Sequence, residues 1–573
     1  MRVSFITFTH FLMAFISSPR IYVRARCLIG CFLVSMTVMA GALPTVNPAA
    51  KETAARQIFE RLVVARGDQR MPPPRFAFSR TKTRGAMFSG DLVTLDEAAY
   101  DVCAALAGDG ESALAGLLAH ELIHYYEKHT WESGFVRLIG QDDRQAAAPL
   151  GRAVKEDAYA ITKDEIEADY QGGFLAHLAG YPTTTVMPRV LEGIYAAYNL
   201  PAEVPQYPPL RERQRIAEET HARLLRLIDV FETGNLLTAL RRYDEAVYYY
   251  DYLAERFPSR EILNNTGVAY VQAAIPLFKP TTLTYVYPVE LDLDSRLAAQ
   301  TRSVGVQRQQ REYLLKTALT YFQRAALLDP AYSTALVNRA SAHALLAASM
   351  AEAPAGTDAE VVEDERIAAG LYARRALRMA TEQSEEITTA NAHLVLAILA
   401  AEAGNDQAAA TGFEKAGASP LYAINEAVRA TGSLPEPPSR PREFAAEEAI
   451  AGKTINELAG NLPEWTRTTV VSRSQPQLRL STAENPETSV RVRYHEVRQS
   501  DDDLLFVSTT SGYSESTTLD VRLGGQTKEI LDEYDEPDYR VPVAGGVLLV
   551  YRESGLLFHL KGDTLISWTI FGE

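Results

Sequence analysis

The chain has 573 residues, which is longer than one hydrophobic core usually serves, so roughly two to four domains are expected. Hydrophobic residues make up 47% of it and charged residues 23%, a composition typical of folded proteins rather than of disordered ones. The formal net charge of -16 disfavours binding to phosphate backbones by bulk electrostatics. We therefore expect no nucleic acid among the partners.

Residues 1–42 have the order of an export signal. Three arginines between positions 20 and 26 precede an apolar run from 27 to 39, and small residues follow at 40–42. The run is too short to span a bilayer comfortably, which predicts cleavage after Ala42, with an uncleaved signal anchor as the alternative. The expected location is the periplasm or cell envelope. Residues 1–42 are also compatible with peripheral association of the protein with a membrane.

Cleavage would remove Cys27 and Cys31 and leave Cys103 as the one remaining cysteine. No intrachain disulfide can then form, even in an oxidising compartment. Cys103 precedes Ala104, Ala105 and Leu106, which favours a small buried hydrophobe over a reactive thiol.

The stretch from Ser112 to His129 is rich in helix-forming residues and free of proline, so it predicts one helix. On that helix His120 and His124 are four residues apart and project from the same face, where both imidazoles can bind one zinc ion. Glu121 flanks the ion as the candidate general base. His129 would point away from the metal face and is expected to be a packing residue.

A catalytic zinc needs a third protein ligand and an open fourth position, and the next acidic helix offers Glu165 as that ligand. Asp169 lies one turn further on the same face, where it can accept a hydrogen bond from a liganding histidine. Gly172 and Gly173 are costly inside a helix unless another backbone packs closely there, which predicts two helices pressed together around the metal. His177 is expected in the core or behind the ligands.

These motifs resemble those of the gluzincin metallopeptidases, the family of HtpX, the CAAX prenyl proteases and BepA. The resemblance covers roughly a third of the chain and implies that Glu165, the first Glu of Glu-x-Glu-Ala-Asp, is the third ligand. A His-Pro pair followed by Arg is common downstream in that family, whereas this chain has Tyr207, Pro208 and then Arg213. Tyr207 is a candidate oxyanion donor, with a structural turn as the alternative, and Arg213 is expected to order the cleft.

Downstream of residue 223 the sequence becomes periodic. Gly234 and Gly267 are aligned anchors, and small and aromatic residues between them stand where paired helices interlock. This pattern resembles tetratricopeptide repeats, which implies a curved protein-binding surface. The alternative is that the array only supports the protease domain. Residues 279–308 interrupt the pattern, and we expect there a loop that reaches toward the cleft.

After a proline-rich stretch at 434–441 the pattern becomes extended, with alternation at 489–494 and apolar runs at 504–507 and 546–551. A small antiparallel sheet is expected. The whole chain is thus predicted to be multi-domain and mainly α. Its predicted parts are an export signal or anchor (1–42), a helical zincin metallopeptidase domain (43–225), an α-solenoid of tetratricopeptide repeats (226–432), a linker (433–465) and a β-rich domain (466–573).

The sequence thus predicts an envelope metalloendopeptidase with one Zn²⁺ per chain, and the family resemblance implies unfolded or misassembled polypeptides as substrates. The repeats would recruit these polypeptides or an envelope assembly machine. One alternative is an assembly scaffold or chaperone whose zinc site is latent or structural. Another is a zinc hydrolase that acts on non-peptide amides.

Overall fold

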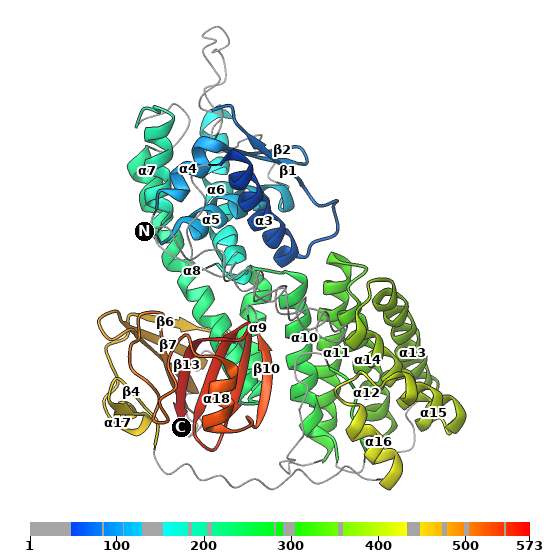
Figure 1. The fold of residues 1–573 in the computed structure, drawn as a ribbon. Helices are drawn as coiled ribbons and strands as arrows, with labels where there is room; N and C mark the ends of the chain where they lie inside the picture. Colours follow the sequence, from blue (N-terminus) through cyan, green and yellow to red (C-terminus); the bar gives the residue numbers. More distant parts are fainter. Residues whose placement is uncertain are drawn as a thin grey trace, which may run out of the picture.

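The computed structural model describes residues 47–82, 85–106, 108–128, 153–181, 186–202, 209–279, 282–289, 304–352, 359–432, 447–472, 478–497, 503–543 and 546–572. Helices predominate, and a separate antiparallel sheet forms the C-terminal region, as the sequence predicts (Figure 1). Within the described residues, no helix combines the length and the apolar character that a bilayer crossing requires. The predicted export signal lies outside the described residues.

Among the described residues, five helices and a small sheet form the N-terminal region, at the top of Figure 1. The helices are α3 (Pro48–Arg66), α4 (Glu97–Ala104), α5 (Gly110–Tyr126), α6 (Ala153–Leu178) and α7 (Met187–Ala197). The N-terminus of α3 is capped by Asn47, whose side chain accepts a hydrogen bond from the Ala49 N–H. Its C-terminus is set by Gly67, which takes the left-handed conformation with φ 60°.

The small sheet consists of β1 (Arg75–Ser79), β2 (Ala86–Ser89) and β3 (Leu92–Asp96), in the order β1-β3-β2. Strand β3 pairs in parallel with β1 and antiparallel with β2. The tight turn between β2 and β3 contains Gly90 with φ 65°, a value that glycine adopts at little cost. Strand β2 is therefore an edge strand, and it lies against α5.

Helices α8 to α15 form a helical array in which consecutive helices pack on one another, and α16 follows them in the chain (Figure 1). They are α8 (Leu210–Ala239), α9 (Tyr243–Arg256), α10 (Arg260–Ala274) with the 3-10 turn η4 (Ile275–Leu277), α11 (Val304–Leu328), α12 (Ser333–Ala351), α13 (Ala359–Glu382), α14 (Glu386–Glu402), α15 (Asp406–Lys415) and α16 (Tyr422–Thr431). The two predicted anchors are contact points. A Cβ on Gly234 would lie 3.2 Å from Tyr249, and one on Gly267 would lie 2.6 Å from the Phe322 ring. Glycine thus lets these helices approach closely.

Eight strands form the C-terminal sheet, in the order β10-β11-β12-β13-β9-β8-β7-β6 with every neighbouring pair antiparallel. They are β6 (Arg467–Val470), β7 (Leu478–Asn485), β8 (Val490–Val497), β9 (Leu504–Thr509), β10 (Tyr539–Val543), β11 (Gly546–Tyr551), β12 (Leu556–Lys561) and β13 (Thr564–Gly572). Along β9, Leu504 and Phe506 join the core shared with the helices, whereas Leu505 and Val507 join a second core. Helix α18 (Thr527–Tyr534) contributes to this second core through Ile530 and Tyr534. Both faces of the sheet are therefore buried at β9.

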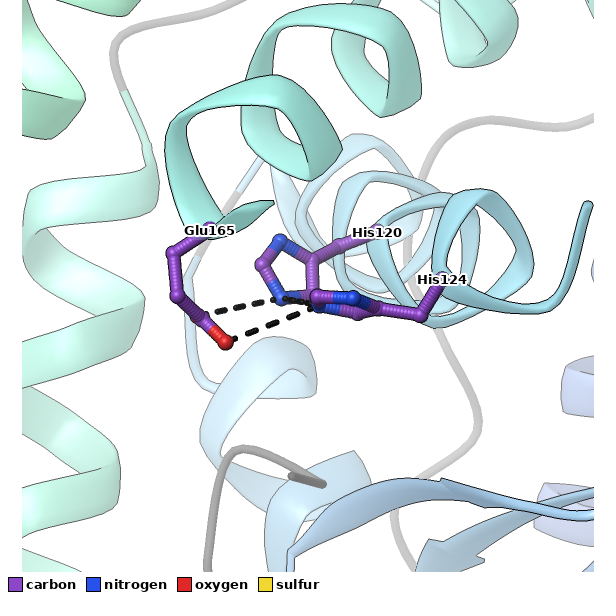
Figure 2. Close-up of side chains that lie close together, drawn as sticks. All are labelled: His120, His124 and Glu165. Carbon is purple, nitrogen blue, oxygen red and sulfur yellow. Dashed lines mark hydrogen bonds and ion pairs between the residues drawn. The ribbon is translucent and has the colours of Figure 1, made fainter. Parts of the chain in front are cut away.

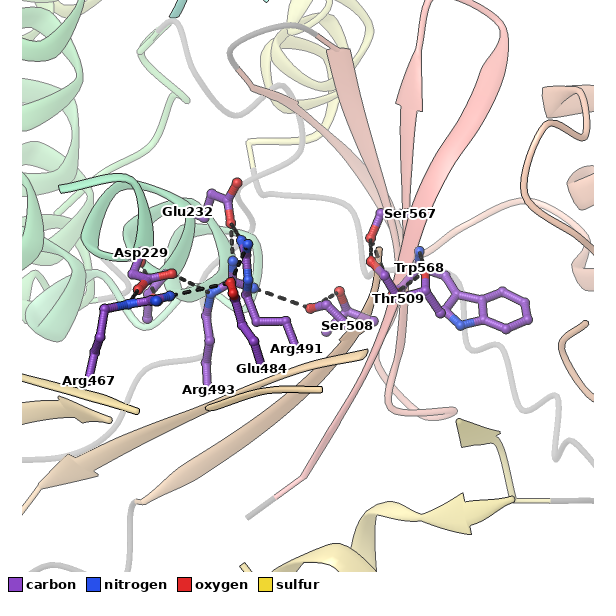
Figure 3. Close-up of polar contacts among 12 residues, drawn as sticks. Asp229, Glu232, Arg467, Glu484, Arg491, Arg493, Ser508, Thr509, Ser567 and Trp568 are labelled. Carbon is purple, nitrogen blue, oxygen red and sulfur yellow. Dashed lines mark hydrogen bonds and ion pairs between the residues drawn. The ribbon is translucent and has the colours of Figure 1, made fainter. Parts of the chain in front are cut away.

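Ion pairs connect this sheet with α8 (Figure 3). Arg467 Nε donates to Asp229 Oδ2 at 2.9 Å, and Arg491 Nη1 lies 3.3 Å from Glu232 Oε2. Arg493 also pairs with Glu232 and is buried, with 4% of its side chain exposed. Because a buried charge is costly without a partner, these contacts hold the sheet and the helix together.

Two predicted boundaries differ from the structure. The boundary between residues 225 and 226 falls inside α8, whose first turns belong to the N-terminal region and whose last turns pack on α9. The predicted linker at 433–465 contains β4 (Ala449–Ile450), β5 (Lys453–Thr454) and α17 (Ile455–Ala459). Ile450 lies in the second core with Ile455 and Leu458 packed against it, so the sheet region begins earlier than residue 466.

Candidate metal centre

His120, His124 and Glu165 converge on one point (Figure 2). The two Nε2 atoms are 3.0 Å apart, Glu165 Oε2 lies 3.4 Å from His120 Nε2, and Glu165 Oε1 lies 3.6 Å from His124 Nε2. Donors bonded tetrahedrally to an ion at about 2.1 Å would be about 3.4 Å from one another. Three donors at these separations can therefore hold a metal ion.

The local sequence explains why the donors meet. His120 and His124 occupy the same face of α5, and Glu165 lies on α6, the helix that packs against it. A Cβ on Gly172 would lie 2.8 Å from the His120 backbone nitrogen, and one on Gly173 would meet the end of the Leu224 side chain. Gly172 thus permits the close packing of α5 and α6 that the sequence predicts, whereas Gly173 permits close packing of α6 on α8.

The centre is buried and electrostatically coupled. His120 is 3% exposed and His124 is 1% exposed. Burial alone would raise the pKa of Glu165, but hydrogen bonding and charge from His120, with His124 and Arg213, hold that pKa at about 2. Burial would lower the pKa of His120, but Asp169 and Glu165 raise it well above its usual value. The carboxylate is therefore ready to bind a cation.

Two residues support the donors from behind. Asp169 Oδ1 lies 2.7 Å from His120 Nδ1, so it can hold the imidazole with Nε2 turned toward the other donors. Arg213 Nη2, at the start of α8, lies 3.6 Å from Glu165 Oε2. Burial lowers the pKa of Arg213, but the neighbouring Glu165 carboxylate raises it overall, so the guanidinium stays charged. Asp169 and Arg213 thus contact His120 and Glu165, two of the three donors.

Glu121 is fully buried at 0% exposure and is not one of the converging donors. Its Oε2 accepts a hydrogen bond of 2.9 Å from the backbone N–H of Phe88, on edge strand β2. The strand thus fixes the orientation of the carboxylate beside the metal donors.

Sequence reasoning did not identify Phe88. The Ser89-Gly90-Asp91 turn between two apolar runs is a hairpin signal that could have located β2. No local pattern, however, reveals that the N–H of Phe88 faces a residue on α5, because that contact joins positions 33 residues apart. Tyr195 of α7, which lies beside Arg213, was missed for the same reason.

The structure places one of the three remaining candidate residues of the centre. Tyr207 and His129 lie outside the described residues. His177 stacks on Phe174, with ring centroids 6.2 Å apart, and is not among the metal donors, as the sequence predicts. Burial lowers its pKa, which favours a neutral packed ring.

Comparison with known proteins identifies no family for this chain. The chain matches no protein-family model, and a search of curated proteins also finds no match. The function must therefore be argued from the arrangement of His120, His124, Glu165 and Glu121.

Proposed function

We propose that the chain is a zinc-dependent endopeptidase in which His120, His124 and Glu165 hold one zinc ion and Glu121 is the general base. The observation that carries this proposal is the convergence of two imidazoles and one carboxylate beside a buried carboxylate that is not a donor. Two nitrogens and one oxygen are a donor set found in catalytic zinc sites, which keep one coordination position open. Structural zinc sites usually take four protein donors.

Bound zinc would supply a Lewis acid that polarises the scissile carbonyl and lowers the pKa of a bound water. Glu121 would accept a proton from the attacking water and then deliver it to the departing amine nitrogen. The Phe88 N–H holds one oxygen of this carboxylate in a fixed orientation. Asp169 would keep the proton of His120 on Nδ1, so that Nε2 is free to bind the ion.

Unfolded or misassembled polypeptides of the cell envelope are the proposed substrates, on the basis of the resemblance to HtpX and BepA. Stacked helices α8 to α15 support a role for this array in protein binding, because such arrays expose extended surfaces. An assembly scaffold with a latent or structural zinc site is the competing function. A scaffold of this kind would not require the Glu121 carboxylate.

The test is hydrolysis of casein by the full chain, with and without a chelator, alongside Glu121→Gln and Glu111→Gln. Glu111 lies in the first turn of the same helix α5, so its variant controls for a charge change on that helix. We expect Glu121→Gln to keep stoichiometric zinc and to lose activity by about 10²–10⁴-fold. Glu111→Gln should behave like the unsubstituted chain.

Three outcomes are informative. Cleavage that the chelator and Glu121→Gln both abolish supports the peptidase. Stoichiometric zinc without cleavage contradicts it and favours the scaffold. Hydrolysis of small acyl amides without cleavage of proteins favours a hydrolase of non-peptide amides.

A further inference from the structure

Residues 282–289 lie between α10 and α11 in the chain but bind to helices further along the array. They form neither helix nor strand. Thr282 binds the Lys279 carbonyl and the Glu352 side chain, whereas Val286, Tyr287 and Pro288 make polar contacts with α16, α14 and α12. The sequence predicts here a loop that reaches toward the metal cleft. The described part of that loop instead contacts the array.

Asn425 of α16 binds the backbone of Val286 from both sides. Its Oδ1 accepts from the Val286 N–H at 2.8 Å, and its Nδ2 donates to the Val286 carbonyl at 3.0 Å. Nδ2 also donates to the Leu421 carbonyl at 2.9 Å, so the amide uses both of its donor hydrogens. Asn425 is 0% exposed. This side chain recognises a peptide unit rather than a particular side chain.

Helices α12 and α14 bind the next two residues of the segment. Ser341 of α12, itself 0% exposed, donates to the Pro288 carbonyl at 2.6 Å. The Tyr287 hydroxyl donates to Glu402, at the end of α14, at 2.9 Å. Tyr287 is 5% exposed, so its ring is buried in the same site. The site thus provides one side-chain acceptor and two side-chain donors for the main chain of the segment, and it buries a tyrosine.

The helix pair that carries the segment does not depend on it for its packing. Phe322 of α11 packs directly against Gly267 of α10. Arg311 of α11 holds the beginning of the connection between α10 and α11. It donates to the Leu277 carbonyl at 2.9 Å and pairs with Glu352 at 3.0 Å. The contacts with Val286, Tyr287 and Pro288 are thus separate from those that close the α10–α11 pair.

We propose that residues 283–289 are a ligand bound in cis, and that α12, α14 and α16 form a peptide-binding site for a non-helical Tyr-Val-Tyr-Pro segment. The site accepts such a segment from another polypeptide only when the resident segment leaves. This inference does not depend on the metal centre or on hydrolysis.

Tethering explains why the resident segment excludes competitors. A segment joined to its site by a short connection has an effective concentration on the order of millimolar. A free peptide with equal contacts must exceed that concentration to displace it. Weakening the resident segment should therefore reveal a site that the unsubstituted chain hides.

The test measures binding of a fluorescent peptide with the sequence of residues 282–289 to the full chain, by anisotropy. Every protein carries Glu121→Gln, so that the peptide is not cut and the result is independent of the proposed activity. Val286→Pro removes the N–H that Asn425 accepts. We expect it to tighten binding of the peptide by about ten-fold or more.

Two controls define the site. Thr284→Pro changes an exposed position of the same segment and should leave the weak binding unchanged. Adding Asn425→Ala to Val286→Pro should remove the gained affinity. Equal binding to the unsubstituted chain and to Val286→Pro overturns the proposal, whether that binding is strong or weak.

Hydrogen exchange in the unsubstituted chain decides the question if Val286→Pro does not fold. The Val286 amide, which donates to Asn425, should be protected, and saturating free peptide at several millimolar should raise its exchange by about two-fold or more. Exchange that the peptide does not change would show that the segment is a permanent part of the array.

Discussion

The Nδ1 atom of His120 lies 2.7 Å from Oδ1 of Asp169, one helical turn beyond Glu165 on α6. Helix α6 therefore contacts both nitrogens of the same imidazole, with Glu165 at Nε2 and Asp169 at Nδ1. One helix thus provides a proposed ligand and the residue that orients another ligand.

Asp169→Asn should weaken zinc binding. The amide oxygen can still accept a hydrogen bond but lacks the charge that makes the imidazole a stronger donor to the ion, so the affinity should fall by about ten-fold. Competition with a chromogenic chelator measures it. Asp364→Asn, at an exposed position on α13, should leave the affinity unchanged, and equal affinities for both variants would contradict the assigned role of Asp169.

Gly172→Ala should disturb the centre more than Gly173→Ala. The added methyl group at 172 would lie 2.8 Å from the His120 backbone nitrogen, which can move only if α5 and α6 separate. The free energy of unfolding should fall by about 1–3 kcal/mol, with weaker zinc binding. At position 173 the group in the way is the end of the Leu224 side chain, which can rotate. Urea unfolding of both variants measures the difference, and equal losses would show that the helices are not held at contact distance.

Glu232→Gln should loosen the contact between α8 and the C-terminal sheet. It removes the closer of the two carboxylate partners of the buried Arg493 and leaves only Asp229, at 3.9 Å. We expect a loss of about 2 kcal/mol, less than for a fully buried pair because 34% of the Glu232 side chain is exposed. Thermal unfolding measures the loss. Glu255→Gln on α9, where the side chain is 71% exposed, should change stability by less than about 0.5 kcal/mol.

The stability lost in Glu232→Gln should depend on pH. Burial would raise the pKa of Glu232, but Arg493 and Arg491, with His177 and His559, lower it to about 2, below the ordinary value of 4.5. A depressed native pKa contributes stability that is fully present above about pH 4.5 and lost as pH falls toward 2. The two melting temperatures should therefore differ most near neutral pH and converge in acid. A difference that grows in acid would rule out this linkage.

Cys103 should not react with thiol reagents in the folded protein. It is 0% exposed, and burial raises the pKa of its thiol to about 12, so little thiolate exists near neutral pH. In a chain with Cys27→Ser and Cys31→Ser, a chromogenic disulfide reagent should label no thiol before unfolding and one per chain in urea. Rapid labelling of the folded chain would show that the α4 core opens.

Several features could be predicted from local spacing. The four-residue separation of His120 and His124 places both on one helical face whatever the rest of the chain does. Glu165 follows from the need for a third donor, and the paired glycines of α6 predict a close helix contact. Alternation along 489–494 predicts a strand because that pattern has a period of two.

Other features depend on contacts between distant positions, and no local pattern encodes them. The Phe88 N–H meets Glu121 only because β2 is the edge strand that lies against α5. Helix α8 crosses the predicted domain boundary because its two ends pack on different regions. Asn425 meets Val286 across 139 positions. The amino-acid sequence alone thus determined the donors and the periodic elements, since both follow from helix and strand geometry, whereas the partners of Glu121, α8 and the 282–289 segment were decided by the tertiary packing.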